Sequence, residues 1–290
     1  MVFHPPVAIV AKAGDTGKYK VSLPAWNMIL RGFMSGAYIA MGAGLATVCS
    51  TGLGATLGVG FAKFILGSVF PVGLIITILT GAELFTGDAM LAPMAAFIHK
   101  VSWASVINLW IWVYIGNLIG SVFYAFLMAY GPLTSWTAAG VGSATAFGVT
   151  AVNIAAGKVA YSGGMASLSL LLKAIGCNWL VNLAILLGIC ADDAIGKIVG
   201  IWFPIMAFVS SGFEHCVANM YFIPAGIMTA PYLSAEQIAT IGIAKVQGLN
   251  WVTMWTNNII LVTIGNIIGG LLFVGVIYWV AFKKEIAALK

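Results

Sequence analysis

Long apolar runs separated by short polar stretches dominate this chain. A helix needs about 20 predominantly apolar residues to cross the hydrocarbon core of a bilayer. Six runs reach that length, and they are Ala25–Thr51, Leu57–Phe97, Val101–Tyr130, Ala166–Ala191, Ile195–Ala230 and Val252–Phe282. The pattern therefore predicts an all-α integral membrane protein with six transmembrane helices.

The second and fifth runs are longer than one simple span requires, and each carries an acidic residue in its middle. Gly81 stands two residues before Glu83, and Gly212 stands two residues before Glu214. Glycine adopts conformations outside the helical region at little steric cost. We therefore expect the second and fifth helices to be broken near these acids.

Two motifs recur in the same order along the chain. Ser/Thr-Gly-x-Glu-x4-Asp/Asn occurs at 80–88 and 211–219, and Ile-Gly-Asn-x-Ile-Gly occurs at 115–120 and 264–269. Because a unit of three spans is odd in number, its second copy must be inverted, and inverted repeats are typical of transporters. The sequence therefore predicts inverted three-helix repeats at about 25–130 and 166–282.

Composition agrees with a bilayer as the main solvent. Of the residues, 61% are hydrophobic and 7% are charged, whereas an ordinary globular domain is about 25% charged. The net charge of +5 does not indicate nucleic-acid binding, because the basic residues cluster in the flanks of the apolar runs. The four cysteines lack the spacing of a metal site, so no metal is expected.

The basic flanks also predict an orientation. With the N-terminus inside, the cytoplasm receives Lys12, Lys18, Lys20, Lys100, Lys197, Lys283, Lys284 and Lys290, as the positive-inside rule requires. We expect a plasma-membrane protein with a cytoplasmic N-terminal segment at 1–24, a channel domain at 25–282 and a cytoplasmic tail at 283–290. Within the first segment, Ala8–Tyr19 is either a cytoplasmic gate or a disordered tail.

Two carboxylates at membrane depth need partners, because an acid there costs at least about 2.5–3.5 kcal/mol on insertion scales. One interpretation is that Glu83 and Glu214 accept hydrogen bonds from backbone N–H groups freed by the breaks. The alternative is that each acid pairs with a lysine or arginine. Asp88 and Asn219 end the two repeated motifs, and we assign all four residues to the structural breaks.

His215 is the one histidine inside an apolar run, and it follows Glu214 directly. A break points half-helix N-termini, which carry partial positive charge, at the middle of the membrane. Such a site favours an anion. We interpret His215 as a pore-lining proton donor or hydrogen-bond partner, with a packed core histidine as the alternative. Thr86 is the polar residue of the opposite break.

Four stretches resemble the formate/nitrite transporter family, namely GAELFTGD at 81–88, GCNWLVNLAI at 176–185, SGFEHCVANMYFIPAGI at 211–227 and IGNIIGG at 264–270. The likeness covers essentially the whole chain and is greatest to archaeal formate carriers. It implies an aquaporin-like fold, a homopentamer and one pore inside each protomer. It also implies a small monovalent anion or its conjugate acid as the substrate.

The resemblance assigns roles to residues of the pore. His215 is similar to the family's central pore histidine, and Thr86 to the threonine opposite it. The remaining pore residues implied are the constriction residues Phe70, Leu74, Phe85 and Phe208, the asparagines Asn178 and Asn266, and the vestibule lysine Lys158. For Lys158 the alternative is a solvated loop lysine.

We therefore expect passive or proton-coupled movement of formate, with protons and the lipid bilayer as the other partners and no cofactor. The alternatives are nitrite or hydrosulfide transport by the same fold and, less favoured, a neutral-solute channel. The aquaporin type would carry two Asn-Pro-Ala triplets, and this chain has none. The chain also lacks a visible nucleophile–base set, metal cluster or nucleotide loop, so an enzyme is not expected.

Overall fold

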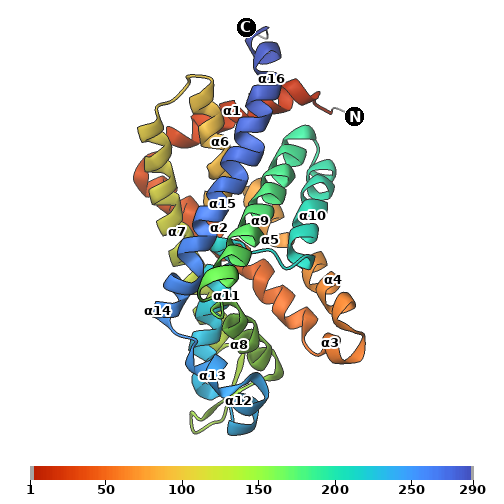
Figure 1. The fold of residues 1–290 in the computed structure, drawn as a ribbon, viewed down its shortest axis with the longest axis vertical. Coiled ribbons are helices and arrows are strands. Elements are labelled where there is room, and N and C mark those ends of the chain that lie inside the picture. The colour runs from red at the N-terminus through yellow and green to blue at the C-terminus, as the bar shows by residue number, and fades with distance from the viewer. Residues whose placement is uncertain (1–2, 289–290) are drawn as a thin grey trace.

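A computed structural model describes residues 3–288, and this part of the chain is almost entirely helical (Figure 1). The α-helices are α1 (Pro6–Val21), α2 (Ala25–Ser50), α3 (Leu53–Thr56), α4 (Val59–Val69), α5 (Val72–Thr80), α6 (Phe85–Phe97), α7 (Trp103–Tyr130), α8 (Ala146–Lys158), α9 (Gly164–Cys190), α10 (Ala194–Ser210), α11 (Cys216–Thr229), α12 (Ala235–Ile241), α13 (Ile243–Gln247), α14 (Trp251–Met254), α15 (Ile260–Gly270) and α16 (Ile277–Ala288). A 3-10 turn, η1 (Ala230–Tyr232), follows α11, and two π-helical segments, η2 (Trp255–Ile259) and η3 (Leu271–Val276), flank α15. The strands β1 (Thr134–Trp136) and β2 (Gly142–Ala144) form a short antiparallel hairpin.

Five helical runs in residues 3–288 are long and apolar enough to cross a membrane, and they are Ala25–Thr56, Val59–Thr80, Trp103–Tyr130, Gly164–Cys190 and Trp251–Ala288. Each overlaps one of the predicted apolar runs. The fifth predicted run, Ile195–Ala230, is instead divided into α10 with 17 residues and α11 with 14. At a rise of about 1.5 Å per residue, neither half reaches the thickness of about 30 Å of a bilayer core.

The chain leaves the helical conformation at both places where the sequence predicts a break. The first gap lies between the end of α5 at Thr80 and the start of α6 at Phe85. The second lies between the end of α10 at Ser210 and the start of α11 at Cys216. The fifth predicted helix is therefore two shorter ones, and the second is α6 preceded by α4 and α5.

The two breaks also share their backbone geometry. Gly81 has φ 76° and Gly212 has φ 73°, a left-handed conformation that glycine adopts without the penalty a Cβ brings. The residue before each second half-helix is extended, with φ −117° and ψ 118° at Leu84 and φ −113° and ψ 120° at His215. The repeated Gly-x-Glu motif therefore encodes the same turn twice.

Small residues let the long helices approach closely around the breaks. A Cβ added to Gly36 of α2 would lie 2.1 Å from the carbonyl oxygen of Asn117 in α7, and one added to Gly269 of α15 would lie 2.4 Å from that of Ile175 in α9. Such glycine contacts are typical of helix packing in membranes. They bring the asparagines of α7 and α15 close enough to reach the broken segments.

The N-terminal stretch is an ordered helix, so the disordered-tail alternative for Ala8–Tyr19 was wrong. It lies in α1, which packs against α6 and α16 (Figure 1). His4 contacts Asp192 at 2.6 Å, between α9 and α10. That hydrogen bond is the main reason why the pKa of Asp192 is lowered. Of the predicted tail, 283–288 extend α16, and Lys290 lies outside the described residues.

α1 packs closely on α6, which predicts that Gly17 cannot be replaced by a larger residue. A Cβ on Gly17 would lie 2.0 Å from the carbonyl oxygen of Leu91, which is inside any tolerable contact. We expect Gly17→Val to displace α1 and to accelerate tryptic cleavage after Lys12 and Lys20 several-fold. Ala11→Val, at a half-exposed position of the same helix, is the control and should leave the cleavage rate unchanged. Equal cleavage rates for the parent and Gly17→Val would contradict the close packing of α1 on α6.

Candidate functional site

The two breaks meet through one hydrogen bond. Thr86, in the first turn of α6, places its Oγ1 2.8 Å from Nε2 of His215, which precedes α11. Both side chains are buried, with exposed fractions of 0% and 3%. The structure thus brings together the two residues that the sequence assigns to opposite breaks.

The other ring nitrogen fixes the tautomer of His215. Its Nδ1 accepts a hydrogen bond of 3.0 Å from the backbone N–H of Ala218 and caps the N-terminus of α11. A nitrogen that accepts carries no proton, so the imidazole is neutral and its proton is on Nε2. Nε2–H therefore donates to the Thr86 hydroxyl, whose own proton is left for another acceptor.

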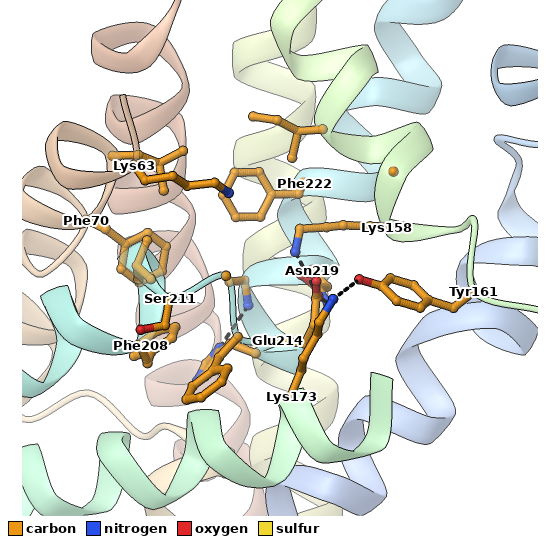
Figure 2. Close-up of a pocket in the computed structure, with 18 of the residues that line it drawn as sticks. Lys63, Phe70, Lys158, Tyr161, Lys173, Phe208, Ser211, Glu214, Asn219 and Phe222 are labelled. Carbon is orange, nitrogen blue, oxygen red and sulfur yellow. Dashed lines mark hydrogen bonds and ion pairs between the residues drawn. The ribbon is translucent and has the colours of Figure 1, made fainter. Parts of the chain in front are cut away.

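Three adjoining cavities run between the two ends of the molecule. A cavity of about 440 Å³ lies at the α8 end and is the pocket drawn in Figure 2. A cavity of about 220 Å³ lies against α1, where it is lined by Tyr19 and Lys20. Between them is a central space of about 10 Å³, which is roughly what one water molecule needs. The site therefore has two open mouths and a closed middle.

Apolar side chains separate the mouths from the central space. Phe70, Phe208 and His215 line both the α8-end cavity and the centre. The rings of Phe70 and Phe208 meet edge to face with centroids 5.8 Å apart, and Phe208 stacks on His215 at 5.9 Å. Leu74 and Leu84 line both the centre and the α1-end cavity. Each mouth is thus closed by its own apolar ring.

Phe85 was predicted at a constriction, but the structure places it elsewhere. Its ring packs between Trp110 at 6.1 Å and Tyr114 at 4.9 Å, and it does not line any of the three cavities. Leu84 lines the pore instead. Successive side chains of an extended segment point to opposite sides, so a single residue decides which one faces the cavity.

Asparagines, rather than the carboxylates, staple the broken backbone. Oδ1 of Asn117 accepts from the N–H of Phe85 at 2.9 Å, and its Nδ2 donates to the carbonyl oxygens of Gly32 and Glu83 at 2.8 and 2.9 Å. This replaces the interpretation that Glu83 holds the freed N–H groups. Asn117 lies in the repeated Ile-Gly-Asn motif, which was the sequence signal for its role.

Asn266 repeats the arrangement at the second break. Its Oδ1 accepts from the N–H of Cys216 at 2.8 Å, and its Nδ2 donates to the carbonyl oxygens of Ala174 and Glu214 at 2.8 and 2.9 Å. Nδ2 of Asn178 donates to the carbonyl oxygen of Asn266 at 2.6 Å. Asn178 and Asn266 are fully buried and line none of the three cavities, so they hold the pore wall from behind.

Thr86 is fixed by two asparagines of α9. Nδ2 of Asn178 and Nδ2 of Asn182 donate to its carbonyl oxygen at 3.0 and 3.1 Å. These bonds leave the hydroxyl of Thr86 free to face His215. Asn182 was not predicted, although it lies in the motif around Asn178.

The carboxylates pair with cations, which is the alternative that the sequence left open. Glu83 contacts Lys20 of α1, and Arg31 lies 3.7 Å from it. Asp88 also contacts Lys20, at 2.9 Å. Lys20 was not predicted at the site, because it lies in the N-terminal helix, 63 residues before Glu83.

The second break has the matching pair. Oε2 of Glu214 accepts from Nζ of Lys158 at 2.8 Å and from Nδ2 of Asn219 at 2.7 Å. The side chain of Lys158 is 15% exposed, so the solvated-loop alternative was wrong. Lys158 ends α8 and lines the larger cavity together with Lys63 and Lys173 (Figure 2).

Both mouths carry an excess of positive charge. Each is lined by three basic side chains and one acid: Lys63, Lys158, Lys173 and Glu214 at the α8 end, and Lys20, Arg31, Lys197 and Glu83 at the α1 end. Field lines in a cleft with one prevailing sign of charge concentrate the opposite ion. The arrangement therefore attracts small anions at either end and resists charge in the middle.

Comparison with known proteins gives one consistent result. Residues 7–280 match the family model described as "Formate/nitrite transporter". The chain is 40% identical over 290 residues to a probable formate transporter of Methanothermobacter thermautotrophicus, covering 98% of each chain. It is 37% identical over 290 residues to the formate channel BtFdhC of Bacillus thuringiensis, covering 100% of each. A solved structure, a pentameric formate channel with formate bound, superposes with a TM-score of 0.74 at 32% identity, covering 89% of this chain and 98% of the other.

The different environments of Leu84 and Phe85 predict different variants. Leu84→Ala removes part of an apolar ring, so we expect larger monocarboxylates to enter liposomes several-fold faster than with the parent. Phe85→Ala removes a packed ring and should destabilise the fold by about 3–5 kcal/mol without widening the size limit. Flux of monocarboxylates of increasing size, together with the melting temperature of each variant, separates the two. A wider size limit in Phe85→Ala than in Leu84→Ala would reverse the assignment.

Proposed function

The chain belongs to the formate/nitrite transporter family, and from this membership we propose that it moves formate across the membrane through a pore in each protomer. It is a multi-pass membrane protein. The observation that carries the proposal is the Thr86–His215 pair, of which His215 lines the closed middle between two positively charged mouths, and Thr86 lies behind it and lines none of the three cavities. Relatives described as formate transporters and channels match nearly the whole chain, which supports formate as the substrate and a transporter rather than an enzyme.

The passage has a physical order. Lys158 and its neighbours gather the anion in the larger mouth, where water still solvates it. The ring of Phe70 and Phe208 then excludes that water, and an isolated charge in such surroundings is far more costly than a neutral group. Formate crosses this region as its conjugate acid, hydrogen-bonded to Thr86 or to Nε2–H of His215. Movement is passive or proton-coupled, and the proton travels with the carboxylate.

The architecture that we propose has six spans in two inverted three-helix repeats, as in aquaporins. The matched breaks and the matched bonds of Asn117 and Asn266 support the repeat. α1 and α16 pack against each other at one end of the molecule (Figure 1), and together with the positive-inside rule this supports cytoplasmic termini in the plasma membrane. The solved relative is a pentameric channel, and we propose the same homopentamer here, embedded in lipid.

The substrate is tested by flux into proteoliposomes. We expect formate to enter at a rate proportional to the reconstituted protein and faster than nitrite or hydrosulfide at equal concentration, because the site is matched to a small carboxylate. Protein-free liposomes give the background. A higher rate for nitrite or hydrosulfide would replace formate with that anion, and equal rates for uncharged solutes of similar size would indicate a neutral-solute channel.

His215 should set the pH dependence of this flux. Protonation of Nδ1 would turn the acceptor for the Ala218 N–H into a donor and break the cap of α11. Asparagine is a favourable N-cap residue and accepts at every pH. We therefore expect His215→Asn to keep formate flux and to lose any change with pH between passive and proton-coupled movement. Flux measured against pH at equal protein density decides, and an unaltered profile would leave His215 without a role in coupling.

A further inference from the structure

A π-helical turn in the last long helical run places two adjacent asparagines against the end of α8. The segment η2 holds Asn257 and Asn258. Nδ2 of Asn257 donates to the carbonyl oxygen of Val159 at 3.0 Å, and Nδ2 of Asn258 donates to that of Lys158 at 2.8 Å. Carbonyl groups in the last turn of a helix lack partners within the helix. The two asparagines therefore cap α8 from outside.

Asn258 makes a second contact that Asn257 lacks. Its Oδ1 accepts a hydrogen bond of 2.8 Å from Nδ2 of Asn219. Both hydrogens of Asn219 Nδ2 are then in use, because the same nitrogen donates to Oε2 of Glu214. Asn258 is fully buried. It thus sets which way the Asn219 amide faces.

These hydrogen bonds form a closed network that begins and ends on Lys158. The backbone carbonyl of Lys158 accepts from Asn258, Asn258 accepts from Asn219, Asn219 donates to Glu214, and Glu214 accepts from Nζ of Lys158. Asn258 therefore contacts the main chain of Lys158 directly, and it is linked to the Lys158 ammonium through Asn219 and Glu214. An ammonium has three donors, and the pairing with Glu214 uses one of them.

Within residues 3–288, the first break has no matching set of asparagine hydrogen bonds around its lysine. Asn117 corresponds to Asn266 in the repeated motif. Leu109 precedes Asn117 by the same number of residues as Asn258 precedes Asn266, and Leu109 is apolar and fully buried. The lysine of the first break, Lys20, contacts Glu83 and Asp88 instead. A π turn inside a long helix is frequently found at a functional site. The turn in η2 places the Asn258 amide against the carbonyl oxygen of Lys158.

We propose that Asn258 is a positioning residue for the anion at the Lys158 mouth. It holds the free donors of the Lys158 ammonium toward the larger cavity, and so it sets the affinity for the entering anion rather than the rate of passage through the middle. This proposal rests on the proposed function of the pore. The anion that it serves is a small monocarboxylate such as formate.

The test compares two neighbouring variants in reconstituted protein. Asn258→Leu removes the hydrogen bonds of Asn258 to Lys158 and Asn219 and keeps a similar side-chain volume. Asn257→Leu removes a cap on α8 and the hydrogen bond that Oδ1 of Asn257 accepts from Thr256, and it leaves the contacts of Lys158 intact. We expect the KM for formate to rise about tenfold in Asn258→Leu, as the loss of a hydrogen bond to a charged network predicts, with the maximal rate changed less than twofold. Asn257→Leu should leave KM within twofold of the parent. An unchanged KM in folded Asn258→Leu, or the same rise in both variants, overturns the proposal.

Two further measurements keep the test decisive. If Asn258→Leu does not fold, Asn258→Asp replaces it in the test. The aspartate keeps an acceptor for Asn219 and loses the donor to the carbonyl oxygen of Lys158, so we expect KM for formate to rise as well. An unchanged KM in Asn258→Asp overturns the proposal. Acetylation of Lys158 by acetic anhydride, followed by mass spectrometry, reads the position of the amine without transport. A changed acetylation rate in Asn258→Leu supports positioning even if the parent moves no formate, and an unchanged rate counts against it.

Discussion

The rest of this structure depends on one requirement, which is that a helix broken inside the membrane must not leave backbone donors without partners. Unsatisfied polar groups are prohibitively costly in a bilayer core, so irregular backbone persists there only where the protein satisfies it. Asn117 and Asn266 each accept one hydrogen bond and donate two at a break. Because these bonds fix the extended residues before α6 and α11, they also fix where the pore is closed.

Local sequence was sufficient to predict where the chain leaves the helical conformation. A glycine before an acid within an apolar run is a local pattern, and the turn it encodes has the same φ and ψ values at both sites. His215 could be singled out because no other histidine lies inside an apolar run. The positions of the breaks need only neighbouring residues, whereas the hydrogen bond between Thr86 and His215 joins residues that are 129 positions apart.

Long-range pairing could not be predicted in the same way. Lys20 reaches Glu83 from a helix that the sequence left as a gate or a tail, and Lys158 reaches Glu214 from 56 residues away. Hydropathy cannot show which lysine faces which acid, because all of them lie at the ends of apolar runs. Phe85 was predicted to line the cavity in place of Leu84 for a different reason. Successive side chains of an extended segment face opposite sides, so an error of one residue changes which side chain faces the cavity.

The two breaks are alike in backbone conformation and differ in the charges around them. Lys20 contacts two carboxylates, Glu83 and Asp88, whereas Lys158 contacts one carboxylate, Glu214, which also accepts a hydrogen bond from the neutral amide of Asn219. The position that ends the repeated motif therefore differs by one negative charge between the halves. A buried ion pair contributes little net stability when desolvation is counted, so stability alone does not explain this difference. Its consequence is electrostatic: the Lys158 ammonium faces one carboxylate where the Lys20 ammonium faces two, although the same turn builds both breaks.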